Sequence, residues 1–398
     1  MLEAAADGGS VLIEATCNQV NHEGGYTGMT PVEFRSQVLR IADRVGLPPE
    51  RIILGGDHLG PNPWRDLPAE QAMERAETTL AAYVSAGFDK IHLDTSMGCL
   101  GEPDALQDSV TAERAARLAA IGEDVAETTG ATPRYVVGTE VPVPGGATET
   151  IERLQVTRPE AARATYAAHR RAFAAAGAGA AFDRVIGLVV QPGVEFGYDN
   201  VVVYRPERAR ELVAVLAEMP AIVFEAHSTD YQPAESLARL VRDGFAILKV
   251  GPALTFALRE ALYSLDYIAL LLDSDWRRHS LATEMERLML ADPRHWESHY
   301  RAPEEEQRIL RHFSYSDRIR YYWPTPAAQE AVERLLARLT DAKIPLTLVS
   351  QFFPRLHERV ASGAVAPTPR DLALEAVRDV LRLYRSACQA PAAPHGPA

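Results

Sequence analysis

Short runs of β-branched and apolar residues recur along the chain up to about residue 254, and a longer segment with helical spacing follows each. The runs are nearly continuous in hydrophobicity, which is typical of parallel strands that are covered by helices on both faces. Strands that alternate with helices predict right-handed crossovers and a parallel sheet. The runs lie at residues 11–16, 51–58, 90–96, 134–140, 184–191, 221–227 and 245–251.

These seven strands are one fewer than a closed TIM barrel, a (β/α)8 barrel, contains. The chain opens in a helical segment, Leu2 to Asp7, that leads directly into the first run. Because a parallel sheet normally begins with a strand, the pattern predicts an α/β TIM-type barrel whose first strand is missing from this chain. An open doubly wound sheet is the alternative, but its usual glycine-rich first turn, G-x-G-x-x-G, is not found in the sequence.

The pattern becomes purely helical after the seventh run. A chain of 398 residues also exceeds what a single hydrophobic core usually serves. The sequence therefore predicts a barrel over 1–254 and a closing and appended helical region over 255–388. The last residues, 389–398, are rich in proline and alanine and are predicted to be disordered.

Charge and composition exclude several classes of partner. The formal net charge of −13 repels nucleic acid and anionic membranes, so neither is an expected partner, although a local basic cluster could still bind a sugar phosphate. We find no uncharged stretch of 18 apolar residues and no signal peptide. Cys17, Cys99 and Cys388 are too scattered for a disulfide framework and fit a reducing compartment. The sequence thus predicts a cytoplasmic protein.

Polar side chains gather where the predicted strands end. In parallel barrels the reactive groups lie at the carboxyl ends of the strands, so these side chains are expected to converge. Two histidines, three carboxylates and a lysine stand there, where a sheet without a site would carry turn formers. The strand-end residues are Asn18, Gln19, Asp57, His58, Asp94, Ser96, Glu140, Gln191, His227, Ser228, Thr229, Lys249 and Gly251.

The two histidines suggest a metal site. His58 and His227 could bind a divalent ion such as Zn²⁺, with Glu140 or Gln191 and a water completing the coordination. Such an ion would polarise a ketone oxygen, and Asp57 would be placed to move a proton. In the alternative interpretation, the histidines only bind loop backbone at the barrel mouth.

Other strand-end features have two interpretations each. His92 shares a strand face with Asp94 and is expected to be a core histidine, and Cys99 is expected to be structural. The proline-rich loop 141–146 could wrap a ligand or simply turn the chain. Lys249 could bind a phosphate or pair with a carboxylate. The aromatic residues 321–323 are expected to pack between helices or to face a partner.

Eight long motifs carry a resemblance to a known family: LIEATCNQVNHEGGYTGMTP (12–31), RIILGGDHLGPNPW (51–64), KIHLDTSM (90–97), GTEVPVPGG (138–146), VVQPGVEF (189–196), EAHSTDYQ (225–232), ILKVGPALTFALREA (247–261) and SDRIRYYWP (316–324). The sequence resembles, from residue 1 to about 388, the GatZ/KbaZ family. The members of this family are non-catalytic subunits of D-tagatose-1,6-bisphosphate aldolase in galactitol and N-acetylgalactosamine catabolism. They usually begin with a further segment that supplies the first strand.

The resemblance also implies a metal site. The family is similar in fold to its partner, a class II zinc aldolase, in which an Asp-His pair and two later strand-end histidines form the site. Asp57 and His58 match the pair, and His227 matches one later histidine. The remaining position falls at Gln191, whose neutral oxygen is a poorer zinc ligand than imidazole. The resemblance therefore implies a weak or vestigial zinc site, unless Glu140 joins it, and a weak or vestigial catalytic role for Asp57.

Two functions compete on these grounds. The first is a stabilising or activating subunit that works with a catalytic class II aldolase subunit of the GatY/KbaY type. The second is a stand-alone, metal-dependent sugar-phosphate aldolase or epimerase. Ser228, Thr229, Lys249 and Gly251 are the residues expected to contact a substrate or its phosphate. A sugar kinase ranks last, because the sequence has no G-x-x-x-x-G-K-[ST] phosphate loop.

Overall fold

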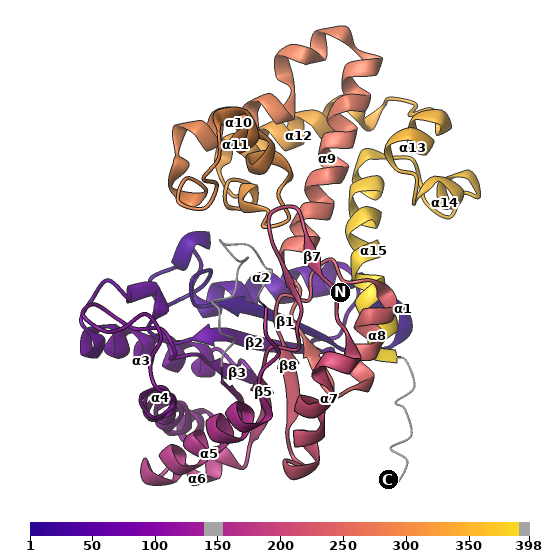
Figure 1. The fold of residues 1–398 in the computed structure, drawn as a ribbon. Coiled ribbons are helices and arrows are strands. Elements are labelled where there is room, and N and C mark those ends of the chain that lie inside the picture. The colour runs from indigo at the N-terminus through magenta and orange to yellow at the C-terminus, as the bar shows by residue number, and fades with distance from the viewer. Residues whose placement is uncertain (139–153, 390–398) are drawn as a thin grey trace.

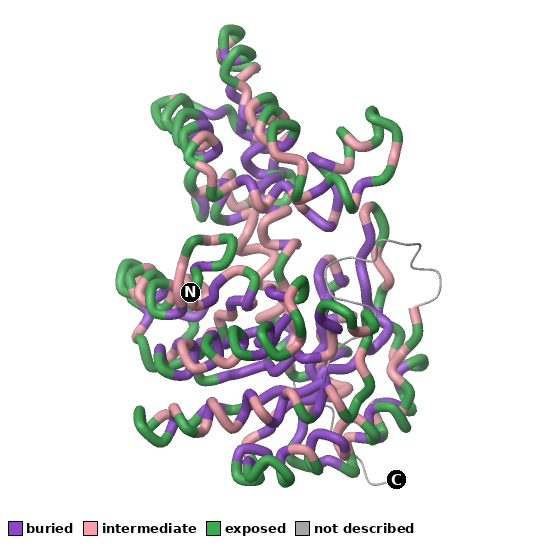
Figure 2. The backbone as a smooth tube through the Cα atoms, turned by 90° about the vertical axis from the view of Figure 1, so that its left-hand side faces the viewer, coloured by how far each residue is buried: buried purple, intermediate pink, exposed green. Residues whose placement is uncertain are grey.

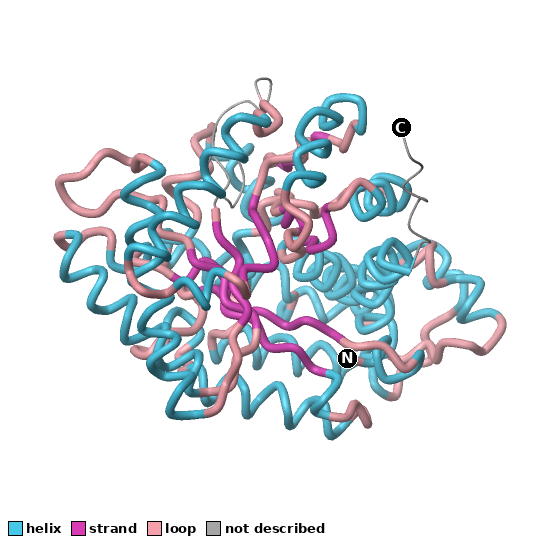
Figure 3. The backbone as a smooth tube through the Cα atoms, turned by 90° about the horizontal axis from the view of Figure 1, so that it is seen from below, coloured by secondary structure: helices cyan, strands magenta, loops and turns pink. Residues whose placement is uncertain are grey.

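The computed structural model describes residues 1–138 and 154–389. All seven predicted strands form one parallel sheet in the order β1-β2-β3-β4-β5-β8-β9, which confirms the α/β prediction. The sheet is curled, and helices surround it (Figures 1 and 3). Its strands are β1 (Val11–Thr16), β2 (Ile52–Leu59), β3 (Lys90–Leu93), β4 (Arg134–Val137), β5 (Val185–Val189), β8 (Val223–Ala226) and β9 (Phe245–Leu248).

Two helices of this part show how local sequence rules set a helix end. In α2, Thr30 and Glu33 form a capping box and Pro31 opens the first turn. Gly130 ends α4 in the left-handed conformation that glycine adopts without steric cost. The helices are α1 (Leu2–Asp7), α2 (Pro31–Arg44), α3 (Ala69–Ser85), α4 (Asp108–Thr129), α5 (Pro159–Ala175), α6 (Gly179–Phe182), α7 (Pro206–Ala214) and α8 (Ala234–Arg242).

The described strands differ from the predicted runs in two respects. The strands β3 and β9 end three residues earlier than the runs, so their polar residues lie in the loops that leave the sheet. In addition, β6 (Glu195–Phe196) and β7 (Val201–Val202) form a short antiparallel hairpin after β5. Two-residue strands are too short to produce a hydrophobic pattern in the sequence.

The sheet is a half-barrel of TIM type over the described residues. Its edge strands, β1 and β9, each pair with one neighbour and not with each other in ranges 1–138 and 154–389. Side chains nevertheless connect the two edges, because the Lys249 ammonium bonds the Glu14 carboxylate. The fold is therefore a curled parallel sheet with a helical extension, as the sequence predicts.

The helical extension forms a second core beside the sheet, shown at the top of Figure 1. Figure 2 shows buried backbone in both the sheet and the extension. Leu265, Ile268, Met285 and Leu335 are fully buried in the second core. The extension comprises α9 (Pro252–Leu272), α10 (Leu281–Ala291), α11 (Glu304–Phe313), α12 (Pro326–Thr340), α13 (Leu346–Phe352), α14 (His357–Ala361) and α15 (Pro369–Gln389). None of the helices in the described ranges is long and apolar enough to span a bilayer.

The last helix, α15, connects the two cores. Leu372 and Ala373 are buried with the extension, whereas Ala387 is buried in the core around the sheet, with Tyr384 packed against it. This helix runs from the extension down to α8 and α1 in Figure 1. The two parts of the described chain are therefore packed together by one continuous helix.

Candidate metal centre

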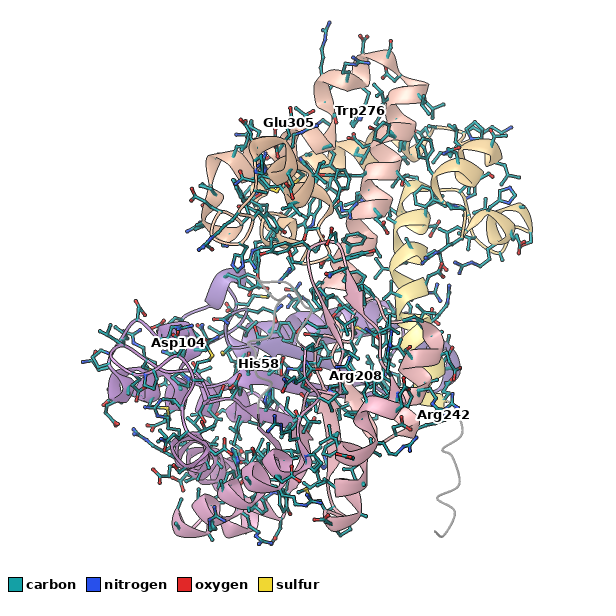
Figure 4. The ribbon with its side chains drawn as sticks, in the orientation of Figure 1. His58, Asp104, Arg208, Arg242, Trp276 and Glu305 are labelled. Carbon is teal, nitrogen blue, oxygen red and sulfur yellow. The ribbon has the colours of Figure 1, made fainter. Side chains whose placement is uncertain are left out.

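Four side chains with metal-binding groups meet at the carboxyl ends of β2, β3 and β8. Asp57 and His58 come from β2, His92 from β3, and His227 directly follows β8. Their candidate ligand atoms all lie within 4.8 Å of one another. We call these four residues the histidine cluster. Figure 4 labels His58 within the sheet, below the helical extension.

Each imidazole of the cluster is anchored through one ring nitrogen by an oxygen atom. Such contacts fix the orientation of the ring. On His92 the opposite nitrogen, Nδ1, also accepts the backbone N–H of His58 (3.2 Å), so a metal ion bound there would have to replace this bond. Outer contacts of this kind are typical of metal-binding histidines. The contacts join His58 Nδ1 to Asp94 Oδ2 (2.8 Å), His92 Nε2 to the Gly138 carbonyl (3.1 Å) and His227 Nε2 to Glu225 Oε1 (2.9 Å).

The backbone at the cluster is strained. His58 has a φ of 49° and Ser228, which follows His227, has a φ of 51°. Non-glycine residues rarely adopt this left-handed conformation, and it concentrates at functional sites because the surrounding structure must enforce it. The register between β2 and β3 also shifts between Gly56 and Leu59, around His58.

Two lysines and further carboxylates surround the cluster inside the sheet. Lys90 Nζ lies 2.7 Å from both Glu14 Oε1 and Glu225 Oε2. Lys249 Nζ lies 2.9 Å from Asp57 Oδ1 and also contacts Glu14. A methyl group at Gly55 would lie 2.4 Å from Glu14 Oε1, so glycine makes room for this carboxylate.

The charges of this network do not cancel without an added cation or added protons. The carboxylates of Glu14, Asp57, Asp94 and Glu225 carry four negative charges. Lys90 and Lys249 supply at most two positive charges, because burial lowers the pKa of Lys249 well below its usual value. Buried charges must be compensated locally. The remaining negative charges, at least two, require protonated imidazoles or a divalent cation.

Protonation of His58 supplies part of this compensation. Burial disfavours the imidazolium, but Asp57 and Asp94 outweigh burial and raise the pKa of His58 to about 9. Burial would raise the pKa of Asp57, yet the neighbouring His58 and His92 hold it well below its usual value. Burial lowers the pKa of His227, with Glu225 opposing the effect. A metal ion would therefore have to displace the His58 proton.

The donor set fits zinc or a similar divalent ion. Three imidazole nitrogens with a fourth oxygen ligand form a common zinc coordination, at metal–ligand distances of about 2.0–2.2 Å. That geometry places the ligand atoms about 3.4 Å apart, so the widest separation here, 4.8 Å, would have to shrink on binding. Rotation of the side chains, with the backbone unchanged, can bring the ligand atoms this much closer.

The structure brings together three of the predicted site residues and adds a fourth. Asp57, His58 and His227 meet as their strand-end positions predict. His92 is fully buried, as a core histidine would be, yet its Nδ1 lies 3.0 Å from Asp57 Oδ1 within the cluster. The sequence feature that could have predicted this role of His92 is its position two residues before Asp94, on the same, inward-pointing face of the strand.

Of the two further predicted ligands, the structure describes only Gln191, which makes other contacts. Gln191 is buried, but its Oε1 accepts hydrogen bonds from the backbone N–H groups of Gly193 (2.7 Å) and Val194 (2.9 Å). Its side-chain oxygen thus shapes the turn after β5, and a ligand role stays a prediction. Glu140 and the loop 141–146 lie outside the described residues.

The residues expected to contact a sugar phosphate border the cluster. The hydroxyl of Thr229, two residues after His227, donates to the Lys249 carbonyl (2.7 Å). Gly251 is the N-cap of α9, and its N–H donates to Asp230 Oδ1 (3.0 Å). The ammonium of Lys249 pairs with carboxylates, which is the second of its two predicted roles.

The extension contacts the barrel loops through the aromatic segment 321–323. Tyr321 packs edge-on against Tyr26, in the loop after β1, with ring centroids 5.1 Å apart. Tyr322 is buried in the core of the extension. These residues thus pack between helices and also join the two parts of the chain.

Cys99 is buried, and burial raises the pKa of its thiol.

A sequence profile described as the GatZ/KbaZ-like subunit of D-tagatose-1,6-bisphosphate aldolase matches residues 1–389. A crystal structure from Sinorhizobium meliloti 1021, described as a probable tagatose 6 phosphate kinase, is 55% identical with a TM-score of 0.91. This match covers 98% of the present chain and 96% of that one. A protein of Coccidioides immitis, provisionally assigned as a fructose-1,6-bisphosphate aldolase, is 16% identical with a TM-score of 0.35, covering 84% of each chain.

Proposed function

Because the chain belongs to the GatZ/KbaZ-like family of D-tagatose-1,6-bisphosphate aldolase subunits, we propose that its histidine cluster is a working metal site for aldol chemistry on ketose phosphates. One observation carries the proposal: a third histidine, His92, supplies the imidazole that the sequence lacks at Gln191. With three anchored imidazoles, the donor set equals that of catalytic zinc sites. The enzyme would be an aldolase, which cleaves a carbon–carbon bond, or an epimerase, which cleaves and re-forms one.

His58, His92 and His227 would hold the metal in this proposal. A bound divalent cation would supply polarisation of the ketose carbonyl and compensation of the negative charge that develops there. Asp57 is ionised at neutral pH, since its neighbours lower its pKa, and its carboxylate can accept a hydrogen bond from a substrate hydroxyl and so orient it. Lys249 Nζ lies 2.9 Å from Asp57 Oδ1 and can donate a hydrogen bond to that carboxylate.

The proposal assigns the rim of the site to the substrate. Ser228, Thr229, Lys249 and Gly251 would contact the sugar or its phosphate from the loops that follow β8 and β9. Thr229 and Gly251 are each held by hydrogen bonds to neighbouring segments, so this rim is ordered before a ligand binds. Ordered polar groups lose less entropy when a ligand binds.

A non-catalytic role is the second candidate, and the family description as an aldolase subunit favours it. In this role the chain would stabilise or activate a catalytic class II aldolase subunit of the GatY/KbaY type. The pathway would be galactitol or N-acetylgalactosamine catabolism in the cytoplasm. The metal site would then be weak or vestigial. A kinase role has no phosphate loop to support it.

Metal content and turnover of the isolated chain separate the two candidates. We expect about one divalent ion per purified chain by mass spectrometry, and cleavage of tagatose 1,6-bisphosphate or 4-epimerisation of a ketose phosphate. His92→Ala should remove both the ion and the turnover. His357→Ala, in α14 of the extension, is the matched control and should retain both. An inactive chain that instead raises the activity of an added catalytic subunit would establish the non-catalytic role.

A further inference from the structure

The turn after β8, residues 227–232, has an unusual backbone. Ser228 has a φ of 51° and Tyr231 has a φ of 62°, so two non-glycine residues are left-handed within four positions. Such a conformation persists only where surrounding contacts impose it. The turn begins at His227, so its shape determines where that imidazole lies.

Contacts from the end of β9 and the start of α9 fix part of the turn. Asp230 Oδ1 accepts from the N–H groups of Gly251 (3.0 Å) and Ala253 (2.8 Å), at the start of α9. The Thr229 hydroxyl donates to the carbonyl of Lys249 (2.7 Å). These bonds hold the turn against the end of β9, but they leave the Thr229 carbonyl for another donor.

A residue far along the chain supplies that donor. The hydroxyl of Tyr384, in α15, donates to the Thr229 carbonyl at 2.7 Å and lies 3.2 Å from the Thr229 hydroxyl. The two residues are 155 positions apart in sequence. Burial raises the pKa of Tyr384, so its hydroxyl stays protonated and remains a donor.

The helix that carries Tyr384 is itself firmly held. Leu372, near its start, is fully buried in the extension core, and Ala387, near its end, is buried in the barrel core. Arg378 pairs with Glu3 of α1 at 2.6 Å. A hydroxyl on such a helix has little freedom to move away from the turn.

We infer that Tyr384 is a positioning residue for the metal site: its bond to Thr229 holds the turn that places the His227 imidazole. The inference rests on the proposed function, because it assigns the metal affinity partly to the C-terminal helix. It also gives α15 a role at the site, because Tyr384 contacts Thr229, which is two residues after His227.

Cobalt binding to the full chain tests the inference. We expect Tyr384→Phe to weaken Co²⁺ binding about tenfold, the lower end of the range for changes to groups that orient metal ligands. The affinity is read from the visible d–d absorption of the bound ion. Tyr135→Phe is the control, because it removes a hydroxyl bond of similar length, 2.8 Å to Glu123, without touching the turn. Equal affinity in Tyr384→Phe and the wild type would overturn the inference.

Hydrogen exchange keeps the inference testable if the wild type binds no cobalt, an outcome that would contradict the proposed function alone. In the metal-free protein, Tyr384→Phe should increase amide exchange in peptides that cover residues 225–232. Tyr135→Phe should leave these peptides unchanged. Unchanged exchange in Tyr384→Phe would show that the turn does not depend on the tyrosine hydroxyl and would refute the positioning role.

Discussion

His58 lies between two carboxylates, which favour its protonated form, whereas burial favours its neutral form. Its Nδ1 is 2.8 Å from Asp94, and its Nε2 is 3.7 Å from Asp57. Both contacts favour the imidazolium, which removes one of the uncompensated negative charges of the network. At this residue, a proton and a metal ion serve the same electrostatic purpose, so each should displace the other.

The pH dependence of the metal-free protein follows from this competition. The pKa of His58 is raised from 6.5 to about 9, so its stabilising effect is complete below pH 6.5 and is lost as the pH rises through about 9. The free energy of unfolding should fall by up to about 3 kcal/mol over this range. Urea denaturation at a series of pH values measures it. The decline should be absent in His58→Gln, and an equal decline in that variant would contradict the assignment.

A glycine directly after β2, Gly60, allows the ends of β2 and β3 to lie close together. A methyl group on Gly60 would lie 1.8 Å from the backbone carbonyl oxygen of Asp94. Neither backbone can move away easily, since Asp94 holds His58 and its N–H bonds the Leu59 carbonyl at 3.0 Å. The close approach of these strand ends is therefore a condition for the cluster.

Gly60→Ala should separate the two strand ends and disturb the His58 contact. We expect it to lower the free energy of unfolding by about 1–3 kcal/mol, as overpacking of a tight interior does. Gly179→Ala is the matched control, because a methyl group there meets no atom within 4 Å and α6 is helical. That variant should be neutral or more stable by up to about 1 kcal/mol. A Gly60→Ala protein as stable as Gly179→Ala would contradict the close approach.

The whole molecule has two hydrophobic cores that share one helix. Because α15 begins in one core and ends in the other, separation of the two parts would expose apolar surface from both. The aromatic contact between Tyr26 and Tyr321 and the bond from the Tyr231 hydroxyl to the Tyr315 carbonyl (2.7 Å) add further connections. We therefore expect the cores to unfold together.

Leu372→Ala tests this coupling. Leu372 is fully buried, so its truncation should cost about 2–5 kcal/mol. Tryptophan fluorescence, which reports mainly on Trp276, Trp296 and Trp323 of the extension, should shift with far-ultraviolet circular dichroism in one transition. Leu374→Ala, on the exposed side of the same helix, should change stability by less than about 0.5 kcal/mol. Two separate transitions in Leu372→Ala would show that the cores are independent.

Part of this protein could be predicted because its causes are local. A buried parallel strand produces a continuous apolar run in the sequence, so the seven runs predicted the strands of the sheet correctly. Because parallel strands end on the same edge, the convergence of Asp57, His58 and His227 followed from their positions alone. The two-residue strands β6 and β7 left no such pattern.

The sequence by itself determined the parallel sheet, the helical extension and the edge at which the polar groups meet. Only the tertiary structure decided that His92 belongs to the cluster, that Lys249 pairs with Glu14 and Asp57, and that Tyr384 reaches Thr229. The physical reason is distance along the chain. Periodicity records which face of an element is buried, whereas the curl of the sheet and the path of α15 decide which side chains meet on that face.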